Sequence, residues 1–124
     1  MDPRYPALTA VLSDYFDGLY HSDTKRLAKV FHADARYVCA TGGTLLHLDM
    51  KEYFAVVDKR PAPASSNEAR TDQIVSIEFA GPVTALARVN CSIAERFFTD
   101  LLSFVFVDGR WQIIAKVFHY DLRG

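Results

Sequence analysis

The sequence predicts an α+β domain in which a curved antiparallel sheet wraps around N-terminal helices and forms a cone with an internal cavity. Two observations predict this class. Roughly the first sixty residues carry apolar side chains at helical spacing with one short hairpin, whereas the rest forms long β-prone runs broken by Gly, Pro and Asp. At 124 residues the chain is long enough to bury one core, so we expect a single domain over residues 1–124.

Two helices are expected at the start of the chain. The first covers residues 6–21, where apolar residues recur every three or four positions. Gly18 lies inside it and costs about 1 kcal/mol relative to alanine, which suggests close backbone packing or a bend at this point. Ser22 or Asp23 then caps a second helix, which we expect to end near residues 32–34.

A short hairpin and a third helix follow. Residues 36–41 and 44–48 flank a pair of glycines, which is typical of a hairpin turn. Asp49 and Glu52 have the spacing of a capping box, in which each side chain accepts a hydrogen bond from the other residue's backbone. We therefore expect a helix that begins after Asp49 and continues to about Lys59.

The C-terminal half is expected to supply the long strands. Residues 69–79 and 83–95 are β-prone runs separated by Ala80-Gly81-Pro82. The Pro- and Ser-rich stretch at residues 60–67 is a loop, and it either lies over the mouth of a cavity or is an ordinary surface connection.

The strongest local signal is the last hairpin, in which residues 97–107 and 110–120 flank Asp108-Gly109. A type I′ turn needs positive φ at both central residues, and Asp-Gly supplies them. If Val107 pairs with Arg110 and the alternation is unbroken, one face is apolar apart from two polar residues. That face carries Phe98, Asp100, Leu102, Phe104, Phe106, Trp111, Ile113, Ala115, Val117 and His119.

Asp100 and His119 are therefore the candidate catalytic residues. They are diagonal neighbours across the predicted ladder. Burial among phenylalanines disfavours the charged form of Asp100 and can create a general acid or base, whereas a His119 partner would keep it ionised. The alternatives are a structural Asp that satisfies His119, a backbone amide or a helix end, and a His119 that lies on the rim of the sheet.

The opposite face of the same hairpin is too apolar for open solvent and too polar for a dry core. Such a surface suits contact with a second copy of the chain, so we expect a homodimer through this outer face. Lys116 lies on this predicted face and fits an ion pair at the interface better than a Schiff-base nucleophile. The predicted interface residues are Leu101, Ser103, Gln112, Ile114, Lys116 and Phe118.

The candidate ligand-binding residues are those expected to face the interior of the cone. Small alanines on the inward face leave room for a ligand, and tyrosines offer hydroxyls to it, although core packing is the usual role of a buried tyrosine. His32 either faces the cavity or caps a helix end through its favourable interaction with the helix dipole. The set is Tyr15, Tyr37, Phe98, Leu102, Ala87, Cys91 and His32.

Composition excludes several classes of function. The formal net charge is −1 and there is no basic stripe, so we expect no nucleic-acid partner. No apolar run is long enough to span a bilayer and the N-terminus lacks a signal-peptide pattern, so we expect no membrane partner and a cytoplasmic location. Cys39 and Cys91 lack zinc-site spacing, so they are expected as reduced thiols, with an internal disulfide as the alternative.

Common catalytic motifs are also missing. The sequence contains no Gly-rich phosphate loop, H-E-x-x-H motif, G-x-S-x-G motif or calcium-binding carboxylate cluster. We therefore expect neither a cofactor nor a metal.

Four segments, at residues 15–20, 27–35, 99–102 and 108–118, carry a family resemblance. With the order of the elements, they resemble the nuclear-transport-factor-2-like (cystatin-like cone) superfamily, and within it the bacterial group described as "putative lumazine-binding" or SnoaL-like. The resemblance covers nearly the whole chain. It implies a cone fold and dimers that pack through the outer sheet face.

The superfamily includes isomerases, dehydratases, polyketide cyclases and binding modules without catalysis, so the resemblance leaves the function open. In the isomerase and cyclase branches, cavity-facing Asp, His and Tyr side chains perform acid-base chemistry. Our first hypothesis is a small-molecule-binding protein that holds an apolar or aromatic ligand in the cone. The alternatives are a cofactor-independent isomerase, dehydratase or cyclase with Asp100 as proton shuttle, and a dimeric interaction module whose cavity is incidental.

Overall fold

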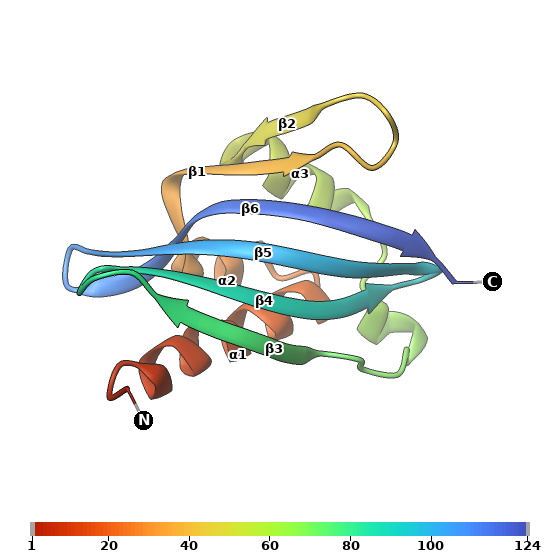
Figure 1. The fold of residues 1–124 in the computed structure, drawn as a ribbon. Coiled ribbons are helices and arrows are strands. Elements are labelled where there is room, and N and C mark those ends of the chain that lie inside the picture. Colours follow the sequence, from red (N-terminus) through yellow and green to blue (C-terminus); the bar gives the residue numbers. More distant parts are fainter. Residues whose placement is uncertain (1, 124) are drawn as a thin grey trace.

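A six-stranded sheet with helices on one face makes up the fold of this computed structural model, which describes residues 2–123 (Figure 1). The elements in chain order are α1 (Tyr5–Tyr20), α2 (Thr24–Val30), β1 (Phe31–Cys39), β2 (Leu46–Asp49), α3 (Met50–Lys59), the short 3-10 helix η1 (Pro63–Ser66), β3 (Gln73–Phe79), β4 (Thr84–Ile93), β5 (Arg96–Val107) and β6 (Arg110–Leu122).

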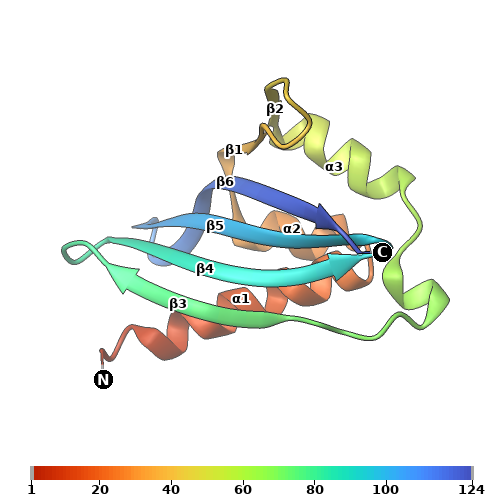
Figure 2. The same ribbon diagram turned by 45° about the vertical axis from the view of Figure 1, so that its right-hand side comes forward.

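The strands lie in the order β2-β1-β6-β5-β4-β3. All neighbours are antiparallel except β1 and β6, which run parallel. The sheet is curved and does not close, and α1 and α2 lie across its concave side (Figure 2). This arrangement confirms the predicted fold class.

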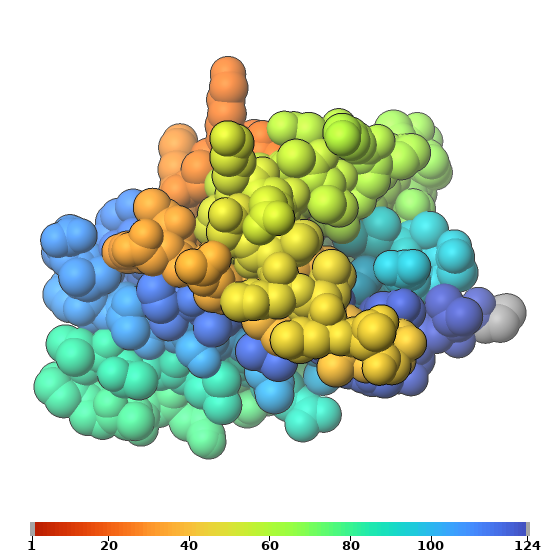
Figure 3. Space-filling view, turned by 90° about the horizontal axis from the view of Figure 1, so that it is seen from above, coloured from red at the N-terminus to blue at the C-terminus, as the bar shows by residue number. Residues whose placement is uncertain are grey.

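The sheet ends on one side at β2, whose first two residues, Leu46 and His47, are exposed. Figure 3 shows the β1–β2 hairpin and α3 gathered over this side of the molecule, with β6 beside them. The hairpin pairs Tyr37 with Leu48 and Cys39 with Leu46, so these residues lie opposite each other as expected. The capping box at the start of α3 is also confirmed, because Glu52 N donates to Asp49 at 2.9 Å and Asp49 N donates to Glu52 at 3.0 Å.

The turn of the last hairpin forms as predicted, with positive φ at Asp108 (55°) and Gly109 (78°). Val107 pairs with Arg110, and the predicted register holds as far as Phe104 and Ile113. Beyond this point the register shifts by one residue, because β6 contains an additional residue at Ile114. This β-bulge exchanges the two faces of the remainder of β6.

Three pairings that an unbroken ladder predicts for this hairpin are therefore wrong. Leu102 lies opposite Lys116 instead of Ala115, Asp100 opposite Phe118 instead of Val117, and Phe98 opposite Tyr120 instead of His119. The reason is physical: one unpaired residue in one strand sends every later side chain to the other face.

The bulge also corrects the predicted dimer interface. Lys116 and Phe118 are buried against the helices, with 5% and 7% of their surface exposed. Gln112 is buried as well, and its amide donates to the carbonyl oxygen of Val107 at 3.0 Å. Of the predicted interface residues, Leu101 remains exposed on the outer face of the sheet.

The second helix ends earlier than predicted, at Val30, and β1 begins at Phe31 instead of residue 36. Phe31 pairs with Ile113 of β6, and the pairing is irregular until Arg36. The ring of Phe31 is buried and contacts the ring of Tyr15 at 6.0 Å between centroids. Sequence periodicity alone predicts that the helix continues through Phe31. The burial of this ring in the core instead favours an extended backbone at this residue.

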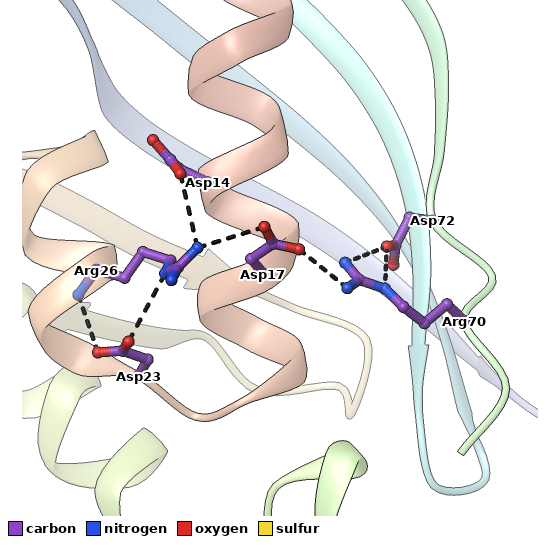
Figure 4. A network of polar contacts seen from close by, with 6 residues as sticks. All are labelled: Asp14, Asp17, Asp23, Arg26, Arg70 and Asp72. Carbon is purple, nitrogen blue, oxygen red and sulfur yellow. Dashed lines mark hydrogen bonds and ion pairs between the residues drawn. The ribbon is translucent and has the colours of Figure 1, made fainter. Parts of the chain in front are cut away.

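A chain of ion pairs ties α1 to its neighbours (Figure 4). Arg26 contacts three carboxylates from α1 and the start of α2, and Arg70 joins α1 to the segment before β3. All these side chains are partly exposed, so each pair contributes about 0–1 kcal/mol. The network consists of Asp14, Asp17, Asp23, Arg26, Arg70 and Asp72.

Gly18 allows α1 and α2 to pack closely. A Cβ atom at this position would lie 2.7 Å from Leu27 Cδ2 and 2.8 Å from Leu27 Cγ, well inside the contact distance. Leu27 has no exposed surface. Of the two explanations suggested for Gly18, close packing is the one confirmed.

Gly18→Ala is therefore expected to destabilise the fold by about 1 kcal/mol, because overpacking exceeds the gain in helix propensity. Urea unfolding measures this difference. In a Leu27→Ala background the same substitution should become stabilising, since the truncated side chain leaves room for the methyl group. A stabilising effect of Gly18→Ala in the unmodified chain would contradict this account of the packing.

Candidate functional site

Three polar side chains meet at the centre of the core: Asp100 of β5, Lys116 of β6 and Tyr15 of α1. Asp100 and Tyr15 have no exposed surface, and Lys116 is 5% exposed. Lys116 lies opposite Leu102 and Asp100 lies opposite Phe118, so Asp100 and Lys116 are diagonal neighbours on the face toward the helices. The bulge at Ile114 is what places Lys116 there.

The contacts within this cluster leave part of it unsatisfied. The Tyr15 hydroxyl donates to Asp100 Oδ2 at 2.6 Å, and Lys116 Nζ lies 4.0 Å from the same oxygen. Lys116 Nζ also donates to the Tyr53 hydroxyl at 3.5 Å. Asp100 Oδ1 is buried and has no hydrogen-bond partner among residues 2–123. The carboxylate therefore keeps one oxygen available to accept a proton or a hydrogen bond.

The ammonium group of Lys116 is surrounded by aromatic rings. Four ring centroids lie between 5.2 and 5.4 Å from Nζ, a distance at which the negative face of a ring attracts a cation. Two of these rings, those of Tyr37 and Tyr53, stack with centroids 4.4 Å apart. The four rings belong to Tyr15, Tyr37, Tyr53 and Phe118.

The electrostatics fix the protonation states of two members of the cluster. Burial opposes the charge on Lys116, but the neighbouring Asp100 carboxylate outweighs it and raises the lysine pKa above its ordinary value. Burial, with Asp100 nearby, also raises the pKa of Tyr15 well above its ordinary value. At neutral pH Lys116 is therefore an ammonium ion, and Tyr15 is a protonated donor to Asp100.

A pocket of about 490 Å³ lies at the end of the sheet where β4 turns into β5. We call it the mouth pocket. It is lined by Arg60, Pro61 and Glu68 on one side and by Glu95, Arg96 and Phe98 on the other. The loop at residues 60–67 thus borders an opening, which is the first of the two alternatives considered for it.

Two phenylalanines connect the mouth pocket with the polar cluster. Phe98 lines the pocket, and its ring centroid lies 5.8 Å from that of Phe118. The Phe118 ring lies in turn 5.3 Å from Lys116 Nζ. Phe98 and Phe118 therefore lie between the mouth pocket and Lys116.

Most of the predicted ligand-binding residues are brought together here. Cys91 is buried, and the pKa of its thiol is raised to about 12 by burial and by the Asp100 charge, which keeps the thiol protonated. Phe98 lines the mouth pocket, as described. The other predicted residues that are buried on the helix-facing side of the core are Tyr15, Tyr37, Ala87 and Leu102.

The two predicted histidines lie elsewhere. The His119 side chain is 58% exposed, and its ring nitrogens bond to Thr41 and Asp121, each at 2.9 Å. The prediction that His119 lies beside Asp100 was wrong because of the bulge. His32 accepts a hydrogen bond from Asp34 N at 3.0 Å and lines a separate pocket of about 440 Å³ near Arg110, so it too lies apart from Asp100.

Sequence reasoning missed three members of the site: Lys116, Tyr53 and Arg60. A lysine within an apolar strand is a weak signal of burial, but the predicted register assigned it to the outside. Tyr53 lies in the expected third helix, where a buried tyrosine ordinarily packs in the core. Arg60 follows a helix and precedes a proline, a position that has no functional signature of its own.

The remaining features of residues 2–123 are negative findings. They contain no group of three or more His, Cys, Asp or Glu side chains placed to hold a metal ion. None of their helices has the length and apolar character needed to cross a membrane. Cys39 and Cys91 are both buried and free, so the alternative of an internal disulfide between them is wrong.

Solved structures share this fold. An NTF2-like protein of unknown function from Shewanella baltica is 25% identical, with a TM-score of 0.85 over 95% of this chain and 94% of its own. A second from Silicibacter pomeroyi is also 25% identical, with a TM-score of 0.83 over 95% of this chain and 96% of its own. A ketosteroid isomerase-like protein from Erwinia carotovora atroseptica has a TM-score of 0.75 over 97% of this chain and 98% of its own, but at 10% identity it shows the fold alone.

One curated relative has a named activity. "Aldolase FrzH" from a Cladobotryum species is 28% identical over 118 residues, which are 94% of this chain and 90% of that protein. A family model described as "Putative lumazine-binding" matches residues 4–119, which confirms the resemblance found in the sequence. The chain belongs to this putative lumazine-binding family of cone-shaped, NTF2-like proteins.

Proposed function

We propose that this chain binds a small carbonyl compound inside its cone and removes a proton from the carbon beside the carbonyl group, with Asp100 as the base and no cofactor. One observation carries the proposal. Asp100 is fully buried, one of its oxygens is held by Tyr15, and the other has no partner in residues 2–123 while an ammonium ion lies beside the carboxylate. A positioned carboxylate of this kind suits general base catalysis.

Lys116 supplies the complementary charge. When Asp100 takes the proton, the electron pair of the C–H bond forms a carbon–carbon double bond and the π pair of the carbonyl group moves to its oxygen, so the enolate carries negative charge there. Lys116 makes one long hydrogen bond, to Tyr53, so it has N–H donors free to stabilise that oxygen. Its raised pKa keeps it charged, which favours this electrostatic role over attack on the carbonyl carbon as a free amine.

Two outcomes follow from the same first step. The proton on Asp100 returns to a different carbon and gives an isomer, or the enolate carbon bonds to a second carbonyl carbon and the proton passes to the new alkoxide. The second outcome is an aldol reaction. The similarity to a protein named an aldolase, over nearly the full length of both chains, supports this class of chemistry.

A second candidate is binding of a planar aromatic molecule without turnover. The rings around Lys116 and the family description favour it. In this case Asp100 and Lys116 orient the ligand through hydrogen bonds, and no proton is transferred to carbon.

The test is deuterium exchange at the carbons beside the carbonyl group of small aromatic ketones such as phenylacetone, followed by proton NMR in deuterated buffer. We expect the wild type to accelerate exchange and Asp100→Asn to lose about a hundredfold or more of that acceleration while still binding the ketone. Asp121→Asn is the matched control, because Asp121 is exposed, and it should exchange at the wild-type rate. Undiminished exchange in Asp100→Asn would contradict the role of Asp100, and binding without exchange in the wild type would favour the second candidate.

The same substitution has a consequence for stability. Asp100→Asn leaves the Lys116 charge buried without its partner, which costs about 3–5 kcal/mol. Replacing both residues, as Asp100→Asn with Lys116→Met, removes the uncompensated charge and should restore much of that loss in urea unfolding. If the double variant were no more stable than Asp100→Asn alone, Lys116 would not be the counter-ion of Asp100.

We further propose that two copies of the chain pair through the outer face of the sheet, now defined by the observed register. Leu86, Leu101 and Val117 are between 38% and 45% exposed, and they lie on the three adjacent strands β4, β5 and β6. Leu101 is directly opposite Val117. This row is the apolar surface that the predicted interface requires.

Leu101→Glu is expected to convert a dimer into a monomer in sedimentation velocity experiments, because it places a charge in the middle of the apolar row. Val56→Glu is the matched control. Val56 is 44% exposed but lies on α3, away from the outer sheet face, so this variant should remain dimeric. A wild type that sediments as a monomer at high concentration would contradict the proposed pairing.

A further inference from the structure

Arg60 has two guanidinium nitrogens in an unusual position. The residue ends α3, and its extended backbone is the conformation favoured before Pro61. Its side chain borders the mouth pocket. Nε and Nη2 are both buried and have no hydrogen-bond partner among residues 2–123. N–H groups of a charged side chain that are buried and unsatisfied are unfavourable, because they have lost their hydrogen bonds to water without replacement.

The charge of Arg60 acts on the interior of the cone. Burial raises the pKa of Tyr37, and the nearby charges of Lys116 and Arg60 oppose that rise. Burial likewise raises the pKa of Cys91, which lies close to Asp100, and Arg60 again acts in the opposite direction. Arg60 therefore lines the mouth pocket and also exerts its positive charge on buried groups of the core.

The two unpaired nitrogens are the pair that recognises a carboxylate. Nε and Nη2 form one edge of the guanidinium plane and present two parallel N–H groups, which match the two oxygens of a carboxylate. Two other charged groups at the pocket have partners: Arg96 stacks over the Tyr120 ring at 4.4 Å, and Glu68 accepts a hydrogen bond from Ala94 N at 2.9 Å. Arg60 is thus a cation of this pocket with two adjacent N–H donors, on Nε and Nη2, that have no partner among residues 2–123.

We infer that the ligand of this cone is a small carboxylic acid, and that Arg60 binds its carboxylate side-on through Nε and Nη2. The inference rests on the proposed function for the place of the ligand, because it extends the site at Asp100 and Lys116 toward the mouth. The carboxylate end lies at Arg60, and the rest of the molecule points to Asp100. Glu68 and Glu95 line the same pocket and repel a doubly charged phosphate more than a singly charged carboxylate, so the pocket favours the latter.

The test uses matched pairs of probes that differ in the carboxylate: phenylpyruvate with phenylacetone, and 3-phenylpropionate with 3-phenylpropionamide. Isothermal titration calorimetry on the whole protein gives the affinities. We expect the wild type to bind each acid about tenfold or more tightly than its neutral partner. Arg60→Gln should abolish this preference, because the acids lose the two N–H donors that distinguish them from their neutral partners.

Two further variants make the result specific. Arg60→Lys should restore part of the preference, because a lysine supplies the charge but cannot offer two parallel donors. Arg96→Gln is the matched control, since Arg96 lines the same pocket and is expected to have no part in recognising the acid. In the wild type, the Nε–H signal of Arg60 should also shift on addition of 3-phenylpropionate.

The inference is overturned if no acid binds more tightly than its neutral partner, or if Arg60→Gln retains the preference. Failure of the proposed function is a different result. Acids held by Arg60 with no deuterium exchange at any probe would retain the carboxylate site and remove the catalytic role of Asp100. Deuterium exchange on phenylacetone without any preference for acids would retain the catalytic role of Asp100 and remove the carboxylate site at Arg60.

Discussion

One additional residue in β6 determines which side chains in the second half of this strand face the interior of the protein. The bulge at Ile114 shifts the register, so Lys116 and Phe118 point toward the helices and His119 points away. With an unbroken ladder, Asp100 would face a histidine near the end of the strand. With the bulge it faces an ammonium ion at the centre of the core. The chemistry available to the site therefore depends on a single backbone irregularity.

A buried ion pair of this kind is seldom a source of stability, since the desolvation of two charges opposes their attraction. Here the pair is held loosely, at 4.0 Å, with one carboxylate oxygen unpaired, and the nearby guanidinium of Arg60 also has unpaired nitrogens. Asp100 Oδ1 and two nitrogens of Arg60 are thus buried without a partner among residues 2–123. A ligand with a carbonyl group and a carboxylate would supply partners for these groups, and this common requirement unites the two proposals.

The parts of the fold that follow local rules were predictable from the sequence. The positive φ values at Asp108 and Gly109, the Asp49–Glu52 capping box and the close packing at Gly18 each depend on a few adjacent or nearby residues. The bulge was not predictable, because Ile114 is as well suited to a regular strand as to a bulge. Asp100 was identified correctly as a buried carboxylate, but its partner depended on that register. The position of Arg60 at the mouth pocket depends on the path of the loop that follows α3, and hydrophobic periodicity does not predict the path of a loop.

The central claim is that the bulge places Lys116, as an ammonium ion, beside Asp100 in the core. The most direct measurement is a pH titration of the Lys116 Nζ resonance by ¹⁵N NMR. We predict that Lys116 remains protonated well above the ordinary lysine pKa of about 10.4 until Asp100→Asn lowers its pKa. A Lys116 that titrates at the ordinary lysine pKa, or that is neutral at pH of about 7, would contradict this account.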